Sequence, residues 1–532
     1  MGRFDAFTSK DFIEQVSILG SLDPARDQDS IPDIVALLGR IPEHEAIMLV
    51  MKDTLKKLFS GSEASTVRYL AAGDREIQKI CIEVAGRERF ASAAAALEAI
   101  ERQASEKKHY RIVFEVMKTL AQIRPEESID LFRKHVDHED SLIASLCIET
   151  LGALNDARSF ERMHGIIMEA EDDSQGGLCD LPTASAIRTL GTFQGRDAVA
   201  FFITMLHHRN PGVRRVIHEE LSRKGMEAVD ALREVFRGDS SDAKIFAANI
   251  LGLIGSKEAA DVLVQALDTN RNAHPNIRYA IYEALGCTSG MAGLVCLADG
   301  LDETDGMVLL AVVTALDMRM NQSILDRISE TIRKETGHGR KLVQAIVASG
   351  AMHIFEGLHR GDEAIASMLL EEIRNSGIGE HIAGYRTILE GMDSDRARND
   401  LRIIDGLPAR EGERRILAVD DSKAMLNFYK GVAASLGMGI STAMNGKEAL
   451  DVIALEERFD LIITDMNMPV MDGVEFTGHV RRDPALSEIP IIMITTESER
   501  SQEDLARKAG VTHFMQKPFD AGKLMERITG CL

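Results

Sequence analysis

The sequence is poor in aromatic side chains, which restricts the partners that it can recognise. Its 532 residues include no Trp and only six Tyr. The formal net charge is −22 at pH 7, and most of the acidic excess falls before residue 414. Recognition of exposed nucleic-acid bases needs a basic groove with aromatic side chains, and anionic membranes also attract basic faces. These absences argue against nucleic acid and membrane as partners and favour a protein.

Cysteine is also scarce, and its spacing argues against two kinds of site. None of the six cysteines forms a C-x-x-C pair, so we expect neither a zinc site nor a disulfide framework. They are better explained as small buried side chains in a reducing compartment. The first 23 residues lack the apolar core of a signal peptide, and no window has the length and purity of a transmembrane helix. We therefore predict a cytoplasmic protein. The six cysteines are Cys81, Cys147, Cys179, Cys287, Cys296 and Cys531.

The signatures of several common enzyme classes are missing as well. The sequence has no Gly-rich phosphate loop, no Gly-Gly-Asp-Glu-Phe cyclase signature, no H-E-x-x-H zinc pattern or its inverse, and no ATP-binding boxes of kinases. Its 15 histidines are scattered, and none lies in a convincing phosphotransfer context. The long N-terminal part of the chain therefore offers no active site of its own.

Near the C-terminus, four short apolar runs each lead into charged or hydroxyl-bearing residues. Runs of β-branched residues between helical patterns predict buried parallel strands, and in a doubly wound sheet the ligand site lies beyond the carboxyl ends of the strands. Four strand ends would thus bring three Asp, one Thr and one Lys to one place. The runs are residues 416–419 before Asp420 and Asp421, 461–464 before Asp465, 491–494 before Thr495, and 511–516 before Lys517.

The chemistry of this cluster indicates a cation and a phosphoryl group. Three carboxylates in one crevice repel one another, so without a cation at least one of them would keep its proton. A site that supplies few carboxylates, a carbonyl group and waters suits Mg²⁺. Lys517 adds a compact positive charge for an anionic oxygen, and Thr495 adds a hydroxyl donor. Together these groups form a socket for a phosphoryl group carried on an Asp.

Residues 414–532 resemble the receiver domain of two-component response regulators. The resemblance implies a flavodoxin-like α/β fold, in which five parallel strands form a doubly wound sheet. It also implies that the phosphodonor is a sensor histidine kinase or a phosphotransfer protein. The matching motifs are Val419-Asp420-Asp421-Ser422, Thr464-Asp465-Met466-Asn467-Met468-Pro469-Val470-Met471-Asp472-Gly473, Ile494-Thr495-Thr496 and Phe514-Met515-Gln516-Lys517-Pro518-Phe519.

The same resemblance implies the roles of the reacting residues. Asp465 would be the nucleophile that is phosphorylated, and Lys517 and Thr495 would contact the phosphoryl oxygens. Phe514 matches the aromatic residue that moves inward in this family when the Thr moves. The protein would then be a phosphoacceptor in signalling, with only self-catalysed phosphoryl transfer and autodephosphorylation, and not a conventional enzyme.

The metal ligands are implied by resemblance too. Asp421, Asp465 and the backbone carbonyl of Asn467 would hold Mg²⁺ directly. Asp420 would act mainly through a water bound to the ion.

A second, weaker pattern recurs through roughly the first 360 residues. A small or apolar pair, such as Leu151-Gly152, Leu251-Gly252 or Leu285-Gly286, returns at steps of roughly 30 to 40 residues, the period of a helical hairpin repeat. Helical patterns alternate throughout, and strand alternation is absent. The units resemble HEAT-like repeats, in particular the short kind found in lyases that attach bilin pigments to light-harvesting proteins. We therefore predict an all-α solenoid before the receiver.

These patterns divide the chain into five expected parts. We also expect the receiver to pack against residues 307–393, because it follows them through only a short linker. A competing interpretation makes residues 382–404 a semi-rigid helix that fixes the position of the receiver. The parts are an N-terminal helical cap or degenerate repeat at 1–60, HEAT-like repeats at 61–360, closing helices at 361–396, a linker at 397–413 and the receiver at 414–532.

Three functional hypotheses remain open. In the first, a histidine kinase phosphorylates Asp465 and thereby regulates the binding of an unknown protein to the solenoid. In the second, the receiver controls a repeat enzyme of the bilin-lyase type. In the third, the receiver drains phosphate from a kinase and the solenoid only docks it.

Overall fold

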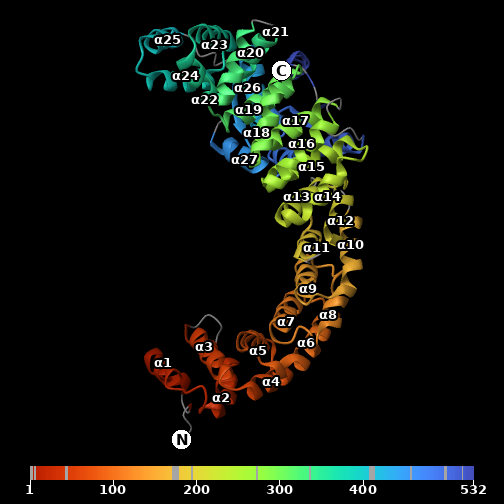
Figure 1. The fold of residues 1–532 in the computed structure, drawn as a ribbon. Coiled ribbons are helices and arrows are strands. Elements are labelled where there is room, and N and C mark those ends of the chain that lie inside the picture. The colour runs from red at the N-terminus through yellow and green to blue at the C-terminus, as the bar shows by residue number, and fades with distance from the viewer. Residues whose placement is uncertain are drawn as a thin grey trace. The chain divides into compact units, whose positions relative to one another are not determined.

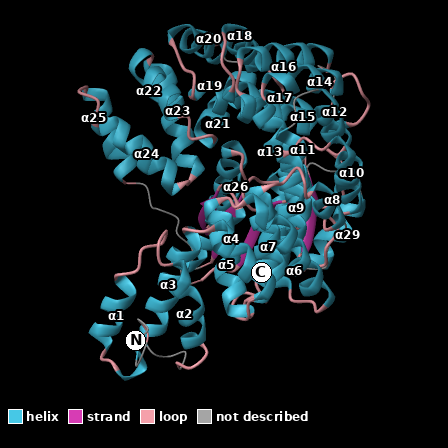
Figure 2. Ribbon diagram, turned by 90° about the horizontal axis from the view of Figure 1, so that it is seen from below, coloured by secondary structure: helices cyan, strands magenta, loops and turns pink. Residues whose placement is uncertain are grey.

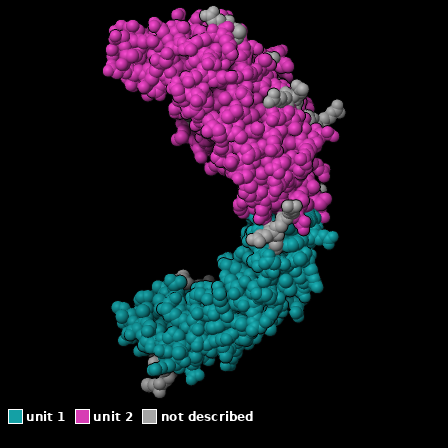
Figure 3. Space-filling view, in the orientation of Figure 1, with its two compact units in different colours: residues 1–167, 180–193 teal, residues 168–179, 194–532 magenta. Residues whose placement is uncertain are grey.

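A computed structural model describes the chain in two compact units (Figure 3). One comprises Met1–Ile167 and Asp180–Phe193, and the other comprises Met168–Cys179 and Gln194–Leu532. The described residues are 4, 7–41, 46–170, 179–192, 196–270, 274–334, 337–406, 414–455, 458–495, 500–517, 519 and 521–532. None of the helices in these ranges combines the length and the apolar character needed to cross a membrane.

In the first unit, alternate helices along the chain pack against one another. α3, α5, α7, α9 and α11 contact one another in that order, and α4 contacts α6. Such a ladder is the arrangement of a helical hairpin repeat. The helices are α1 (Phe12–Gly20), α2 (Ile31–Leu38), α3 (Ala46–Ser60), α4 (Glu63–Ala72), α5 (Arg75–Glu88), α6 (Ala94–Glu106), α7 (Tyr110–Ile123), α8 (Ile129–Lys134), α9 (Ser141–Ala153), α10 (Phe160–Glu169) and α11 (Leu181–Thr192) (Figure 1).

The second unit also contains two rows of helices, in which alternate helices pack against one another. We call α13, α15, α17, α19, α21 and α23 the odd row, in which each helix contacts the next. The helices are α12 (Arg196–Thr204), α13 (Pro211–Lys224), α14 (Met226–Val235), α15 (Ser241–Ile254), α16 (Lys257–Thr269), α17 (Pro275–Cys287), α18 (Met291–Asp299), α19 (Gly306–Asp317), α20 (Gln322–Arg333), α21 (Gly337–Ala348), α22 (Met352–Gly361), α23 (Glu363–Ser376), α24 (Gly379–Glu390) and α25 (Asp395–Asp405).

The recurring Leu-Gly pairs mark the seams between odd-row helices. A Cβ atom added at Gly252 of α15 would lie 3.0 Å from Cα of Ala284 in α17. One added at Gly286 of α17 would lie 2.8 Å from Cβ of Ala315 in α19. At these positions glycine lets neighbouring helices approach more closely than any side chain allows, which explains the periodic signal in the sequence.

We expect Gly286→Val to destabilise the repeats by about 2 kcal/mol, because the larger side chain forces α17 and α19 apart. Thermal unfolding followed by circular dichroism would measure the loss. Gly306→Ala is the matched control, since an added Cβ atom there meets nothing within 4 Å. Equal melting temperatures for the two variants would mean that α17 and α19 are not closely packed at Gly286.

The expected linker at 397–413 is partly helical. Residues 397–405 belong to α25, whose N-cap Ser394 accepts a hydrogen bond from the backbone nitrogen of Ala397. Only Ala397 and Ile404 of this helix are buried, so its charged composition resembles that of a linker. Residues 407–413 lie outside the described residues.

The C-terminal α/β domain contains a sheet of five parallel strands in the order β2-β1-β3-β4-β5. The strands are magenta in Figure 2, and helices partly cover them in that view. Helical repeats followed by this sheet confirm the predicted fold class. Three predicted strands match closely, β5 starts two residues later than expected, and no apolar run had marked β2. The elements are β1 (Arg415–Val419), α26 (Lys423–Ser435), β2 (Gly439–Ala443), α27 (Gly446–Leu455), β3 (Leu461–Asp465), α28 (Gly473–Arg482), β4 (Ile491–Thr495), α29 (Arg500–Ala509), β5 (His513–Gln516) and α30 (Ala521–Cys531).

Helices cover both faces of the sheet. Ile416 and Ala418 of β1 share a buried cluster with residues of α26 and α30. Leu417 and Val419, which alternate with them, share another cluster with residues of α27 and α28. Because these strands are buried on both faces, their sequences are continuous apolar runs. The polar residues that follow their carboxyl ends lie together at one edge of the sheet.

Candidate functional site

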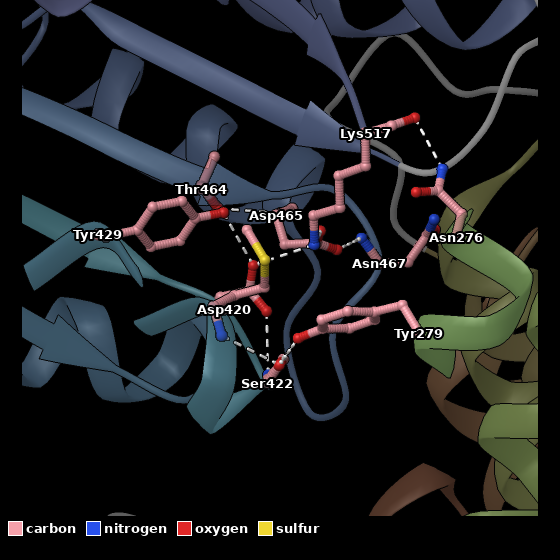
Figure 4. A network of polar contacts seen from close by, with 10 residues as sticks. Asn276, Tyr279, Asp420, Ser422, Tyr429, Thr464, Asp465, Asn467 and Lys517 are labelled. Atoms are coloured by element: carbon pink, nitrogen blue, oxygen red, sulfur yellow. Dashed lines mark hydrogen bonds and ion pairs between the residues drawn. The ribbon is translucent and has the colours of Figure 1, made fainter. Parts of the chain in front are cut away.

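Four strand ends bring polar side chains together at one edge of the sheet. The Nζ atom of Lys517, just after β5, lies 2.7 Å from Oδ1 of Asp465 and 3.2 Å from Oδ2 of Asp420 (Figure 4). Asp465 ends β3 and is 6% exposed, while Asp420 follows β1 and is fully buried. Thr495, also fully buried, ends β4 between β3 and β5.

Short-range hydrogen bonds orient the two buried carboxylates. Oδ1 of Asp420 accepts a hydrogen bond from the backbone nitrogen of Ser422 at 2.9 Å, and Oδ2 accepts one from Tyr429 Oη at 3.0 Å. Oδ2 of Asp465 accepts a hydrogen bond from the backbone nitrogen of Asn467 at 2.8 Å. The sequence motifs did not include Tyr429, and only its place on the apolar face of a helix could have indicated it.

Burial dominates the electrostatics of the site. It raises the pKa of Asp465 to about 6, although Lys517 acts in the opposite direction. Reduced hydration in the wall of the site, followed by the charges of Asp420 and Asp465, raises the pKa of Asp421 well above its usual value. For Lys517, burial favours loss of the proton, but Asp420 and Asp465 outweigh burial and its pKa is raised. The site thus holds more carboxylate groups than one ammonium group can neutralise.

This donor set fits Mg²⁺. Among the described residues, no three His, Cys, Asp or Glu side chains form a ready metal cage, and the ammonium group of Lys517 contacts both buried carboxylates. Asp421, however, lines an adjoining cavity, where its carboxylate is accessible to a hydrated ion. Because Mg²⁺ retains several waters and takes only one or two carboxylates, it does not need a closed cage of side chains.

Phe514 lies in the middle of the edge strand β5 and is half-buried. It packs against a small buried cluster that includes Met466, Met493 and Leu505. This cluster includes Met466, the residue that follows Asp465.

The adjoining cavity has a volume of about 550 Å³ and is walled by the α/β domain and the odd row. Asp421, Ser422 and Asn467 line it on one side, and Arg214 and Glu283 line it on the other. Burial, to which the charge of Asp420 adds, raises the pKa of Glu283 to about 7. A fourth carboxylate thus faces the site from α17, and none of the sequence motifs indicated it.

α17 contacts two loops of the site directly. The Nδ2 atom of Asn276 donates a hydrogen bond to the backbone oxygen of Lys517 at 2.7 Å. The hydroxyl of Tyr279 lies 2.6 Å from Oγ of Ser422, and both α17 side chains point toward the site (Figure 4).

α13 contacts the loop after β3. Nη2 of Arg214 donates a hydrogen bond to Oδ1 of Asn467 at 3.0 Å. Nη1 of the neighbouring Arg215 lies 3.0 Å from Oε2 of Glu475 and donates to the backbone oxygen of Val470. Together, α13 and α17 touch all three loops that carry the carboxylates and the ammonium group.

Further contacts hold α26 against the last repeats. Nδ2 of Asn427 donates to the backbone oxygen of Ser349 at 2.5 Å, and Oδ1 of Asn427 lies 3.3 Å from Nε2 of His381. Lys430 and Glu380 form an ion pair at 2.6 Å. These contacts fall within the expected range 307–393, but α13 and α17 precede it, so that range was too narrow.

Comparisons with known proteins match two parts of the chain. The family of response regulator receiver domains matches residues 416–529, and the family of HEAT repeats matches residues 229–317. A chemotaxis protein CheY homolog of Campylobacter jejuni is 37% identical over 119 residues, which are 22% of this chain and 92% of that protein. CheY1 of Helicobacter pylori is 38% identical over 115 residues, which are 21% of this chain and 93% of that protein. The solved structure of CheY4 of Vibrio cholerae is 36% identical, with a TM-score of 0.22, and the match covers 23% of this chain and 100% of that one.

Proposed function

Because the chain belongs to the response regulator receiver family through its C-terminal domain, we propose that Asp465 accepts a phosphoryl group from a phosphohistidine. The donor is a sensor histidine kinase or a phosphotransfer protein in the cytoplasm. Phosphorylation of the receiver, residues 414–532, then regulates the binding of a protein to the repeats, residues 61–360. The observation that carries the proposal is the contact of one ammonium group, that of Lys517, with two buried carboxylates at the strand ends.

Each residue of the site has a defined task in the transfer. A carboxylate oxygen of Asp465 forms the new bond to phosphorus, the N–P bond of the donor breaks, and the imidazole nitrogen takes up a proton. The ammonium group of Lys517, 2.7 Å from Oδ1 of Asp465, neutralises charge on the transferred group. Thr495, on the adjacent strand, donates its hydroxyl to a phosphoryl oxygen. When Thr495 moves toward the phosphoryl group, Phe514 on the neighbouring strand β5 moves inward.

The metal ion supplies a second positive charge. When bound, Mg²⁺ offsets the negative charge that develops on the phosphoryl oxygens. Asp421, Asp465 and the backbone carbonyl of Asn467 would hold it directly, and Asp420 would act through a water. The raised pKa values of Asp421 and Asp465 support this assignment, because a bound cation stabilises carboxylates whose charged form is disfavoured by loss of hydration and, next, by neighbouring carboxylates.

Metal binding provides the test of this proposal. We expect Asp421→Ala to weaken Mg²⁺ binding by about 100-fold, because it removes a direct ligand, and Asp420→Ala by about tenfold. Titration calorimetry would give both affinities, and rates of phosphorylation by phosphoramidate should fall in the same order. Asp451→Ala, an exposed carboxylate on α27, serves as the control. An unchanged affinity in Asp421→Ala would mean that the carboxylates gather for another reason.

A further inference from the structure

The repeats contact the phosphorylation site itself. Tyr279 contacts Ser422, which follows β1. Asn276 donates to the backbone of Lys517, which follows β5. Arg214 donates to Asn467, which follows β3. These three loops are the ones that carry the carboxylates and the ammonium group of the site. Any rearrangement of the site therefore acts directly on the contacts with α13 and α17.

We propose that Arg214, Asn276, Tyr279 and Glu283 form a surface, here called the clasp, that binds the active-site face of the unphosphorylated receiver and releases it when Asp465 is phosphorylated. The occupant of this surface is the receiver of the same chain, which is seated on it in the structure. The proposal rests on the function proposed above. It adds that the repeats sense the phosphoryl group at the site where it is bound.

Glu283 places a carboxyl group of the clasp beside the phosphorylation site. Its carboxylate lines the same cavity as Asp421, and Asp420, Asp465 and Lys517 all act on it electrostatically. A phosphoryl group bonded to Asp465 changes the contacts of that carboxylate with Lys517 and with the backbone nitrogen of Asn467, and Asn276 and Arg214 bind these same two residues. Arg214, the opposing cation, is already engaged by Asn467 and by the backbone oxygen of His208. Phosphorylation should therefore loosen the contact.

The clasp and a protein phosphodonor compete for the same face of the receiver. A donor protein has to bring its imidazole ring to Asp465, which is 6% exposed, past the three loops that α13 and α17 contact. Release of the clasp therefore precedes transfer from a protein. By linkage, whatever favours docking disfavours phosphorylation, and phosphorylation disfavours docking to the same degree.

Amide hydrogen exchange on the full chain tests the clasp. Mg²⁺ with beryllium trifluoride serves as the phosphoryl mimic, and fluorine resonance spectra establish that it is bound. We expect the bound mimic to raise exchange in α17 and in the loops at 420–422 and 466–472.

Two variants loosen the clasp without the mimic. Tyr279→Phe removes only the hydroxyl that contacts Ser422, and Asn276→Ala removes the bond to the Lys517 carbonyl. Each should raise exchange in the same loops by about fivefold, the effect of one lost hydrogen bond. Tyr282→Phe is the matched control, because Tyr282 lies on the same helix and interacts with Glu303 inside the repeats.

The possible results separate the two proposals. If fluorine spectra show no bound mimic, the function proposed for Asp465 fails and the clasp fails with it. If the mimic binds and exchange in α17 and the two loops is unchanged or reduced, only the clasp is overturned. The same conclusion follows if Tyr279→Phe and Tyr282→Phe give equal exchange.

Discussion

Asp465→Asn is expected to abolish phosphorylation of the chain. Phosphoramidate and Mg²⁺ should add one phosphoryl group to the wild-type protein, labile to base and to hydroxylamine as acyl phosphates are. The amide oxygen of Asn is a far weaker nucleophile than the carboxylate that Lys517 holds in place at 2.7 Å. Intact-mass measurement before and after hydroxylamine treatment would follow the group.

Asp451→Asn is the control for this experiment, because it makes the same change on the exposed face of α27. It should be labelled like the wild type. Undiminished labelling of Asp465→Asn would show that another residue is the acceptor.

Gly473→Ala is expected to have the largest effect on stability in the receiver. A Cβ atom at Gly473 would lie 2.0 Å from the backbone oxygen of Asp465 and 3.1 Å from Oγ1 of Thr464. The first turn of α28 would have to move away from the end of β3, at a cost of about 3 kcal/mol. Thermal unfolding of the full chain should show a lower transition for the receiver, and phosphorylation of the remaining folded protein should slow.

Gly530→Ala near the end of α30 controls for the loss of a glycine as such, since nothing lies within 4 Å of its added Cβ atom. Equal stability of the two variants would mean that β3 and α28 have room to separate. In that case the Asp465 carbonyl is not held by close backbone packing.

The sequence predicted the sheet where burial leaves a simple mark. β1, β3 and β4 are buried on both faces, so each reads as an unbroken apolar run. β2 is an edge strand with half-exposed positions at Ile440, Ser441 and Thr442, and such a strand leaves no apolar run. The strand ends that gather at the site could be predicted because parallel topology alone places them at one edge.

The contacts between repeats and receiver could not be predicted in the same way. Tyr279 and Ser422 are 143 positions apart, and Arg214 and Asn467 are 253 apart. Each repeat residue lies on a helix whose pattern specifies only which side faces the neighbouring helices. Which exposed residues then meet the receiver depends on the position of the whole domain, which no local pattern encodes.

The ionisation of Glu283 could not be predicted from the sequence either. In the sequence it is one Glu among many in an acidic chain, within the helix that contains the Leu285-Gly286 pair. Its chemistry changes only because the fold encloses it with carboxylates from the other end of the chain. A residue of this kind can be recognised only after folding has brought these groups together.

The glycine seams make the odd row mechanically stiff. Across the contacts at Gly252 and Gly286, backbone meets Ala284 and Ala315 without a long side chain that could change rotamer and absorb a shift. A small displacement of α17 is therefore passed on to α15 and α19 as movement of whole helices. We therefore expect a displacement of α17 at the contact between Tyr279 and the receiver to move the neighbouring repeats as well.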